Sequence, residues 1–374
     1  MSRALLPAAL THLRQDIQSM HGYAIQDAKG MVKLDAMENP YALSAELQAK
    51  LGERLGKLPI NRYASLPLED LKAALRTYAQ VPADYAIMLG NGSDELISLL
   101  AMACDLPGAK VLAPMPGFVM YEMGAKFQGL QFIGVPLRDD FELDEPAMLS
   151  AIAQNKPAIT YIAYPNNPTG TLWDEEAIKN IIAACAVHGG LVVMDEAYQP
   201  FSSRTWMAHI HNAPERNANV LLMRTLSKFG LAGVRIGYLT GPAALVNEVD
   251  KLRPPYNISI LNCVCALFAL EHAQVYQQQA SEIRSERAML LDALGKMPGV
   301  QAMPSEANII LVRVQGKDSA DTGAAAKVFA GMKAHKVLIK NVSTMHPLLT
   351  NCIRLSVGTP AENQQMLTAL QASL

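Results

Sequence analysis

The stretch that decides both the fold and the chemistry of this chain lies past its midpoint and reads Arg224-Thr225-Leu226-Ser227-Lys228-Phe229-Gly230-Leu231-Ala232-Gly233-Val234-Arg235. An apolar run at residues 219–223 leads into it and is typical of a buried strand. Hydroxyl side chains precede Lys228, glycines follow it, and Arg235 closes the segment. A lysine at a strand end among such donors can form an imine with an aldehyde while its neighbours hold that aldehyde's phosphate.

Short apolar runs alternate with helical periods on both sides of this stretch. The expected helices cover residues 68–79, 93–104, 117–126 and 174–187. The expected strands cover residues 110–113, 131–135, 158–163, 191–194 and 220–223. Brief, continuously apolar runs between helices are typical of buried parallel strands, so the sequence predicts an α/β fold with a mostly parallel sheet between helices. Ligands of such sheets bind at the carboxyl ends of the strands.

The length of the chain, 374 residues, is too great for one ordinary core. The pattern predicts an N-terminal segment at 1–66, a large domain at 67–258 and a smaller α+β domain at 259–374. The smaller domain is expected to begin with one long helix at 259–297. Short strands (300–303, 308–314, 337–340 and 351–357) and a final helix near 360–373 are expected to follow.

The composition excludes several classes of protein. Half of the residues are apolar, 18% are charged and the net charge is -2, which argues against a general nucleic-acid or membrane binder. The five cysteines are an odd number in mostly apolar surroundings, so we expect no disulfide framework, no metal site and a cytoplasmic location. The N-terminus lacks the pattern of a signal peptide, and the longest apolar stretch, near residues 96–104, is too short to span a bilayer.

Asp195 ends the expected strand at 191–194, and Tyr198 follows three residues later. A carboxylate at the end of a buried strand is costly unless it is paired. A protonated pyridine nitrogen is a suitable partner, and the tyrosine could donate to a phenolate-type oxygen on the same ring. An aspartate that caps the next turn would give the same sequence.

Two loops offer further polar groups. Tyr164-Pro165-Asn166-Asn167-Pro168-Thr169-Gly170 is a rigid turn in which the Asn167 amide could reach a ring oxygen of a ligand, although a plain tight loop also fits. Gly90-Asn91-Gly92-Ser93-Asp94-Glu95 opens a helix, where free N–H groups suit a phosphate. Because a phosphate repels a carboxylate, Asp94 would contribute its backbone N–H. An ordinary N-cap at Ser93 is the alternative.

Phe118 and Arg354 complete the set of candidate site residues. Phe118 follows the strand at 110–113, where its ring could stack on a flat heterocycle or simply pack in the core. Arg354 lies in a strand-like run, where its guanidinium could bind a carboxylate or phosphate through two hydrogen bonds. An exposed strand face would also place an arginine there.

The motifs together describe one ligand. A phosphate would meet the Ser93 and Asp94 amides, Thr225, Ser227 and Arg235. A ring would meet Phe118, Asn167, Asp195 and Tyr198, and an aldehyde carbon would meet Lys228. The ligand with these three parts is pyridoxal 5'-phosphate.

These residues also carry a family resemblance. With Lys33-Leu34-Asp35-Ala36-Met37-Glu38-Asn39-Pro40-Tyr41, Arg62-Tyr63, Arg253-Pro254-Pro255-Tyr256-Asn257 and Arg354-Leu355-Ser356-Val357-Gly358, the chain resembles the fold-type I aminotransferases over nearly its whole length, and the histidinol-phosphate aminotransferases most closely. The resemblance implies reversible amino transfer between L-histidinol phosphate and 2-oxoglutarate, which gives imidazole acetol phosphate and L-glutamate in histidine biosynthesis. Lys228, Asp195 and Tyr198 would be catalytic, with Lys228 as the general base and acid. Arg354 would bind the acidic group of each substrate in turn.

The resemblance also implies a homodimer. Tyr63 would reach the cofactor phosphate of the neighbouring subunit, and Tyr23 and Asn39 would lie near the substrate. Many relatives carry an arginine where this chain has Lys340, which offers a point charge in place of a planar fork for the substrate phosphate. The small domain would combine the N-terminal segment with the C-terminal third.

Other functions fit parts of the same pattern. An aromatic or other amino-acid aminotransferase would share the motifs, and so would a PLP-dependent phospho-amino-acid decarboxylase. A PLP-binding regulator is disfavoured because no basic N-terminal domain is present to bind DNA. A nicotinamide dehydrogenase is disfavoured because no Gly-x-Gly-x-x-Gly follows the first strand.

Overall fold

The computed structural model describes residues 9–19, 26–63, 66–316, 318 and 321–374. The chain forms two compact units, residues 1–30 and residues 31–374. The described part of the first unit contains the short helix α2 (Gln15–Gln18). All further elements belong to the second unit. Among the described residues, no helix combines the length and the apolar character needed to cross a membrane.

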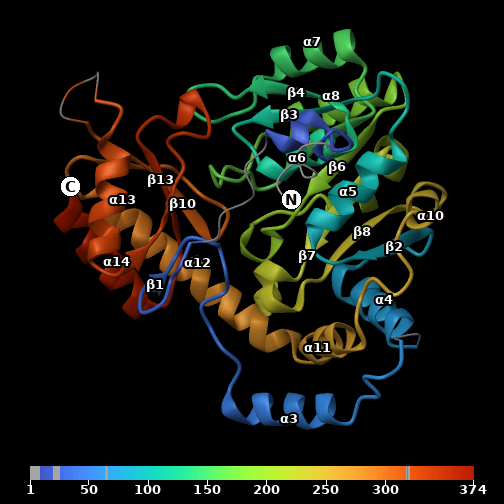
Figure 1. The fold of residues 1–374 in the computed structure, drawn as a ribbon, viewed down its shortest axis with the longest axis horizontal. Coiled ribbons are helices and arrows are strands. Elements are labelled where there is room, and N and C mark those ends of the chain that lie inside the picture. The colour runs from blue at the N-terminus through green and yellow to red at the C-terminus, as the bar shows by residue number, and fades with distance from the viewer. Residues whose placement is uncertain (1–8, 20–25, 64–65, 317, 319–320) are drawn as a thin grey trace, which may run out of the picture. The chain divides into compact units, whose positions relative to one another are not determined.

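The centre of the second unit is a seven-stranded sheet with the order β2-β8-β7-β6-β5-β3-β4 (Figure 1). Its strands are β2 (Tyr85–Gly90), β3 (Lys110–Met115), β4 (Gln131–Pro136), β5 (Ile159–Ala163), β6 (Leu191–Asp195), β7 (Val220–Thr225) and β8 (Gly237–Pro242). Neighbouring strands pair in parallel except at β8, which is antiparallel to both β2 and β7. The predicted mostly parallel α/β sheet is confirmed. The apolar runs predict five of the seven strands, and β2 and β8 are not among them.

Most helices of this part of the chain connect the strands or flank the sheet, whereas α3 (Ala45–Gly56) lies away from the sheet (Figure 1). The others are α4 (Leu66–Ala79), α5 (Ser93–Ala103), α6 (Val119–Gln128), α7 (Glu145–Asn155), α8 (Glu175–Ala186), α9 (Met207–Asn212) and α10 (Ala243–Asp250). Local chemistry fixes several of their starts: the Asp144 and Asp174 side chains accept hydrogen bonds from the N–H groups of Ala147 and Ala177 in the first turns of α7 and α8.

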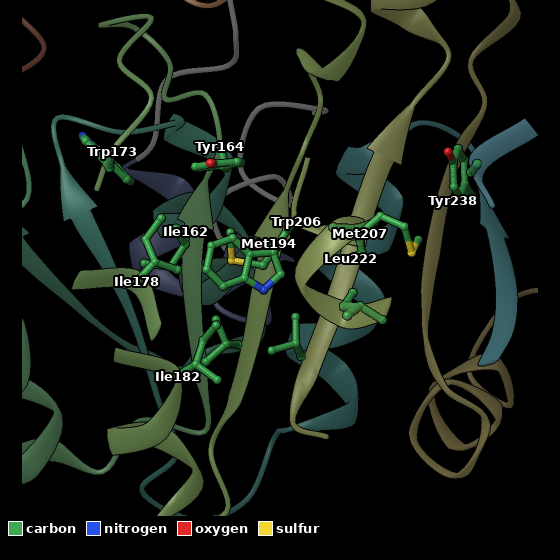
Figure 2. Packing of buried hydrophobic residues seen from close by; sticks show 14 of the residues in the cluster. Ile162, Tyr164, Trp173, Ile178, Ile182, Met194, Trp206, Met207, Leu222 and Tyr238 are labelled. Atoms are coloured by element: carbon green, nitrogen blue, oxygen red, sulfur yellow. The ribbon is translucent and has the colours of Figure 1, made fainter. Parts of the chain in front are cut away.

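Alternate residues of the strands enter two separate apolar layers because side chains of a strand point to opposite faces. Ile162, Met194 and Leu222 belong to one layer, with Trp173 and Trp206 from the connecting segments. Figure 2 shows part of this layer. The residues that follow or precede them in the strands belong to the other layer, which packs against α5 and α6; they include Tyr161, Ala163, Val193, Leu221 and Met223. The central strands are therefore buried on both faces, as their unbroken apolar sequences require.

The C-terminal part forms a second, smaller sheet with its own apolar core. Its strands are β9 (Val300–Ala302), β10 (Ile309–Val314), β12 (Lys340–Asn341) and β13 (Cys352–Ser356), all antiparallel in the order β12-β13-β10-β9. Helices α13 (Ala324–Ala334) and α14 (Pro360–Ser373) belong to the same part. In addition, β1 (Val32–Lys33) of the N-terminal segment pairs in parallel with β11 (Val337–Leu338). The exact domain boundaries at 66/67 and 258/259 stay predictions.

Two expectations for this part are corrected. The predicted single helix at 259–297 is two helices, α11 (Ile260–Glu271) and α12 (Ala273–Gly295), because His272 leaves helical geometry with φ -111° and ψ 29°. The predicted strand at 337–340 is divided as well: β11 pairs with β1, whereas β12 pairs with β13. The spacing of apolar residues along the sequence predicts neither interruption. Both depend on the segments that pack or pair with these residues in the folded protein.

Candidate active site

A cavity of about 350 Å³ opens at the carboxyl ends of the strands of the large sheet. This is where the strand-end rule places a ligand. Ten of the predicted site residues line it: Ser93, Asp94, Phe118, Asn167, Asp195, Tyr198, Thr225, Ser227, Lys228 and Arg235. They lie at or just after the carboxyl ends of β2, β3, β5, β6 and β7, and Arg235 precedes β8. The fold thus gathers at one edge residues that lie more than a hundred positions apart.

Lys228 follows β7 in a single π-helical turn (Ser227–Leu231). Gly230 has φ 138° in this turn, and a Cβ there would lie 2.7 Å from the Tyr276 ring, so both conformation and space require glycine. The Lys228 amine donates to the Ala36 carbonyl at 3.2 Å and lies 5.8 Å from the centre of the Tyr198 ring. Burial, and after it the charge of Arg354, lower the pKa of Lys228 to about 8.

Asp195 is the last residue of β6 and is buried. Its Oδ1 accepts the Ala197 N–H at 3.0 Å, and its Oδ2 accepts the Tyr121 hydroxyl at 2.6 Å. Burial raises the pKa of Asp195 and these two hydrogen bonds oppose the rise, which leaves the pKa at about 6. The carboxyl group is therefore ionised at neutral pH and available as the partner of a cation in the cavity.

Donors for an anion gather at the other end of the same cavity. The Arg235 guanidinium lies 3.4 Å from the Ser227 hydroxyl and 3.3 Å from the Asp94 carboxylate. Thr225 donates to Ser227, and the first N–H groups of α5 open at Ser93. Gly92, at φ 82°, makes room for this cluster, because a Cβ there would lie 2.5 Å from the guanidinium of Arg235. This cluster can donate hydrogen bonds to a phosphate group from hydroxyls, from N–H groups at a helix start and from an arginine.

The flat part of a ligand would lie between these two regions. Phe118 lines the cavity and makes an edge-to-face contact with Tyr121, with 5.6 Å between ring centres. Tyr198 is buried, and burial raises the pKa of its phenol, so the hydroxyl stays a donor at neutral pH. A flat heterocycle that carries an oxygen could stack on the Phe118 ring. Its oxygen could accept hydrogen bonds from the Tyr198 phenol and the Asn167 amide.

Arg354 contacts Asn167, which lines the cavity. Its guanidinium donates to the Asn167 side-chain oxygen at 2.7 Å and to the Asp35 carbonyl at 2.8 Å. The arginine is buried and belongs to β13 of the smaller sheet, so this contact joins the two sheets at the site. The arrangement places a fixed positive charge beside the cavity.

Asn39, Lys340 and Tyr63 are not among the residues that line the cavity. The Asn39 amide donates to the Phe229 carbonyl at 3.3 Å and to Gln279 at 2.9 Å, which ties the N-terminal segment to the turn that carries Lys228. Lys340 is the cross-strand neighbour of Arg354 in the pairing of β12 with β13. Tyr63 is 75% exposed and stacks on Tyr256. Tyr23 lies outside the described residues.

Several residues at the site carry no sequence signal strong enough to assign them beforehand. Tyr121 contacts Asp195, and Ala36 and Glu38 of the N-terminal segment line the cavity. Beneath the cavity, Glu196 forms a buried ion pair with Arg224 at 2.8 Å. The spacing of Tyr121, one helical turn after Phe118, places both on one side of the helix, but such a position is equally typical of the core.

The comparisons with known proteins agree with this geometry. The family model for aminotransferases of class I and II matches residues 29–370. A histidinol-phosphate aminotransferase of Paracidovorax citrulli (strain AAC00-1) is 61% identical over 99% of both chains. The histidinol-phosphate aminotransferase 2 of Burkholderia pseudomallei (strain 1710b) is 52% identical over 97% of this chain and 98% of its own.

A solved structure gives the same result. The histidinol-phosphate aminotransferase of Sinorhizobium meliloti, in complex with pyridoxal-5'-phosphate, superposes with a TM-score of 0.81 at 25% identity and covers 96% of this chain and 97% of its own. The predicted fold and family are confirmed. The chain belongs to the class I and II aminotransferases and, within them, to the histidinol-phosphate aminotransferase family.

Proposed function

We propose that this protein transfers the amino group of L-histidinol phosphate to 2-oxoglutarate, giving imidazole acetol phosphate and L-glutamate in histidine biosynthesis. The observation that carries the proposal is the meeting, in one cavity, of a lysine of lowered pKa, an ionised buried aspartate and a cluster of anion donors. These groups fit the aldehyde, the ring nitrogen and the phosphate of pyridoxal 5'-phosphate.

The cofactor would be held by five groups of residues. Ser93, Asp94 through its backbone N–H, Thr225, Ser227 and Arg235 would bind the phosphate. Phe118 would cover the ring, Asn167 and Tyr198 would donate to its oxygen, and Asp195 would pair with its nitrogen. Lys228 would hold the aldehyde carbon. When bound, the cofactor supplies an electron sink for the bond between the substrate Cα and its hydrogen.

The chain's own residues perform the rest of the reaction. Lys228, once its amine is free and neutral, would remove the proton from the donor's Cα and return a proton to the carbon of the cofactor that carries its aldehyde. Asp195 keeps a proton on the ring nitrogen. Arg354 binds the phosphate of histidinol phosphate in one half-reaction and a carboxylate of glutamate in the other. Tyr23, Asn39 and Lys340 are proposed to border the substrate.

We also propose a homodimer in the cytoplasm, in which Tyr63 reaches the cofactor phosphate of the neighbouring subunit. The stack of Tyr63 on Tyr256, with 75% and 52% of these residues exposed, supports a partner surface here. Ile60, 72% exposed, lies close in sequence. Sedimentation of the purified protein tests the dimer, and a monomer at micromolar concentration would contradict it.

The choice of substrate is tested by steady-state kinetics with several donors. We expect kcat/KM for histidinol phosphate to exceed that for phenylalanine, with 2-oxoglutarate as acceptor and no release of carbon dioxide. A preference for phenylalanine would indicate an aromatic aminotransferase. Carbon dioxide formed from a phospho-amino acid would indicate a decarboxylase instead.

Replacing Arg235 with alanine should weaken cofactor binding by about 10- to 100-fold, because a hydrogen bond to a charged group contributes roughly 1.5–3 kcal/mol. The dissociation constant of pyridoxal phosphate, measured by absorbance with the apoprotein, checks this. Arg138→Ala is the matched control, since Arg138 is exposed and pairs only with Asp140 among the described contacts. Equal affinities for the two variants would remove Arg235 from the phosphate site.

Capture of the cofactor should accelerate as the pH rises and level off above about pH 8. The neutral amine is the nucleophile, and the pKa of Lys228 is lowered to about 8, so about half of the molecules carry a neutral lysine at that pH. An ordinary lysine would still gain rate up to about pH 10. Stopped-flow absorbance of apoprotein mixed with pyridoxal phosphate measures the profile, and a continued rise beyond pH 9.5 would contradict the lowered pKa.

A further inference from the structure

Tyr121 makes a contact with Asp195 that the proposed mechanism does not use. Its hydroxyl donates to Asp195 Oδ2 at 2.6 Å, and both residues are buried. Tyr121 lies in α6, one helical turn after Phe118, and lines the same cavity. A bond this short between a phenol and a carboxylate is of the strong, charge-assisted kind.

The tyrosine ring is held in place from two sides. It stacks on Tyr161 with 4.3 Å between ring centres and 5° between planes, and it meets the edge of Phe118. Burial and the charge of Asp195 raise the pKa of Tyr121 well above its usual value, so the phenol keeps its proton and remains the donor. The hydroxyl is thus a fixed donor aimed at one carboxylate oxygen.

The electrostatic surroundings otherwise favour the protonated acid. Burial raises the pKa of Asp195, and the nearby carboxylates of Asp94 and Glu196 raise it further. Arg235 pairs with Asp94 and Arg224 pairs with Glu196, so both carboxylates are partly compensated. Two hydrogen bonds lower the pKa of Asp195: the one from the Tyr121 hydroxyl has the larger effect, and the one from the Ala197 N–H has the smaller.

We propose that Tyr121 is a positioning residue that keeps the shared proton of the Asp195–cofactor pair on the ring nitrogen. This inference rests on the proposed function. A carboxylate that already accepts a strong hydrogen bond is a weaker base, so the proton stays on the nitrogen. Without the Tyr121 hydroxyl the proton moves from the nitrogen to Asp195, the ring becomes neutral, and the electron sink weakens. No other reactant takes part in this transfer.

The test compares Tyr121→Phe with Tyr161→Phe in the cofactor-loaded enzyme. Both variants lose one hydroxyl from a buried ring of the same stacked pair, so they share any cost in packing. Solid-state ¹⁵N NMR of ¹⁵N-labelled pyridoxal phosphate reports whether the ring nitrogen carries a proton. We expect the protonated shift in wild type and Tyr161→Phe, and a shift toward the unprotonated value in Tyr121→Phe.

A kinetic measurement accompanies the spectrum. The half-reaction with histidinol phosphate should slow by about tenfold in Tyr121→Phe, which corresponds to roughly 1.4 kcal/mol, with an unchanged apparent affinity for the donor. Melting temperatures of the loaded variants verify that both fold. A wild-type nitrogen shift and rate in folded Tyr121→Phe, or equal changes in both variants, would overturn the inference. If wild type itself fails to bind the cofactor through Lys228, the proposed function fails instead.

Discussion

Replacing Lys228 with alanine is expected to reduce turnover of histidinol phosphate and 2-oxoglutarate by at least about 10,000-fold, the upper range for the loss of a general acid–base. The effect is large because one amine has two tasks, holding the aldehyde and moving the Cα proton. No second lysine lines the cavity among the described residues. Steady-state turnover and single-turnover rates with preloaded cofactor measure the two losses separately.

The groups that bind the phosphate and the ring nitrogen of the cofactor should be unaffected by this substitution. The donors around Arg235 and the carboxylate of Asp195 are untouched, so Lys228→Ala should still bind pyridoxal phosphate, although without a covalent bond. Borohydride treatment should attach the cofactor to wild type at Lys228 and leave the variant unlabelled in mass spectra. Lys251→Ala is the control, since Lys251 is exposed and paired with Glu248. Residual turnover within tenfold of wild type would exclude the assigned role.

Replacing Asp195 with alanine is expected to slow the half-reaction by roughly a thousandfold. Removing one partner of a buried charge pair costs about 3–5 kcal/mol, and this loss falls on the step in which the ring nitrogen must hold its proton. The cofactor should still bind through its phosphate and through Lys228. Rapid-mixing absorbance with saturating donor measures the rate.

Chemical rescue separates the electronic role of Asp195 from a structural one. A pyridoxal phosphate analogue methylated at the ring nitrogen carries a permanent positive charge, so it should restore part of the lost rate in Asp195→Ala. Asp292→Asn, a change at an exposed aspartate of α12, should behave as wild type. The pKa of Asp195 is raised from 3.8 to about 6 in the folded protein. The folded state therefore loses stability as the pH rises between these two values, and the loss is complete above about pH 6. The apoprotein variant should therefore fold, and absence of rescue in a folded variant would argue against the electron-sink role.

The sequence predicted the fold where burial leaves an unambiguous pattern. Four of the five predicted strands, β3, β5, β6 and β7, lie inside the sheet and are apolar runs because both of their faces are covered, whereas β4 is an edge strand. The two strands that escaped prediction, Tyr85–Gly90 and Gly237–Pro242, have glycine or proline at their ends, residues that are more frequent in turns than in strands. The pairing of these two with each other is antiparallel and bonds segments about 150 residues apart, which no local pattern encodes.

The site was predictable to the extent that it follows strand ends. A parallel sheet brings the carboxyl ends of its strands to one edge, so Asn167, Asp195 and Lys228 could be placed together from their positions alone. Tyr121 could not, because an aromatic residue on an apolar helix is the ordinary sign of a core position. Its function depends on a single hydroxyl distance, 2.6 Å to Asp195, which only the packed structure provides.

Arg354 and Asn39 illustrate a second limit. The strand pattern left open whether Arg354 binds an anion or lies on an exposed face, and its partners, Asn167 and the Asp35 carbonyl, come from segments at least 187 residues away in the chain. Asn39 is expected beside the substrate, and the sequence gives no sign that its amide donates to the Phe229 carbonyl and the Gln279 side chain. Contacts between distant segments depend on how the two sheets pack, and a linear pattern carries no information about that.

The half-reaction with histidinol phosphate tests the central claim most directly. Protein loaded with pyridoxal phosphate is mixed with histidinol phosphate in the absence of any 2-oxo acid, and the visible absorption of the bound cofactor is followed. We predict that the band disappears within a single turnover, that one equivalent of imidazole acetol phosphate forms per site, and that 2-oxoglutarate restores the band. A band that persists at saturating histidinol phosphate would contradict the assignment of this site to histidinol-phosphate transamination.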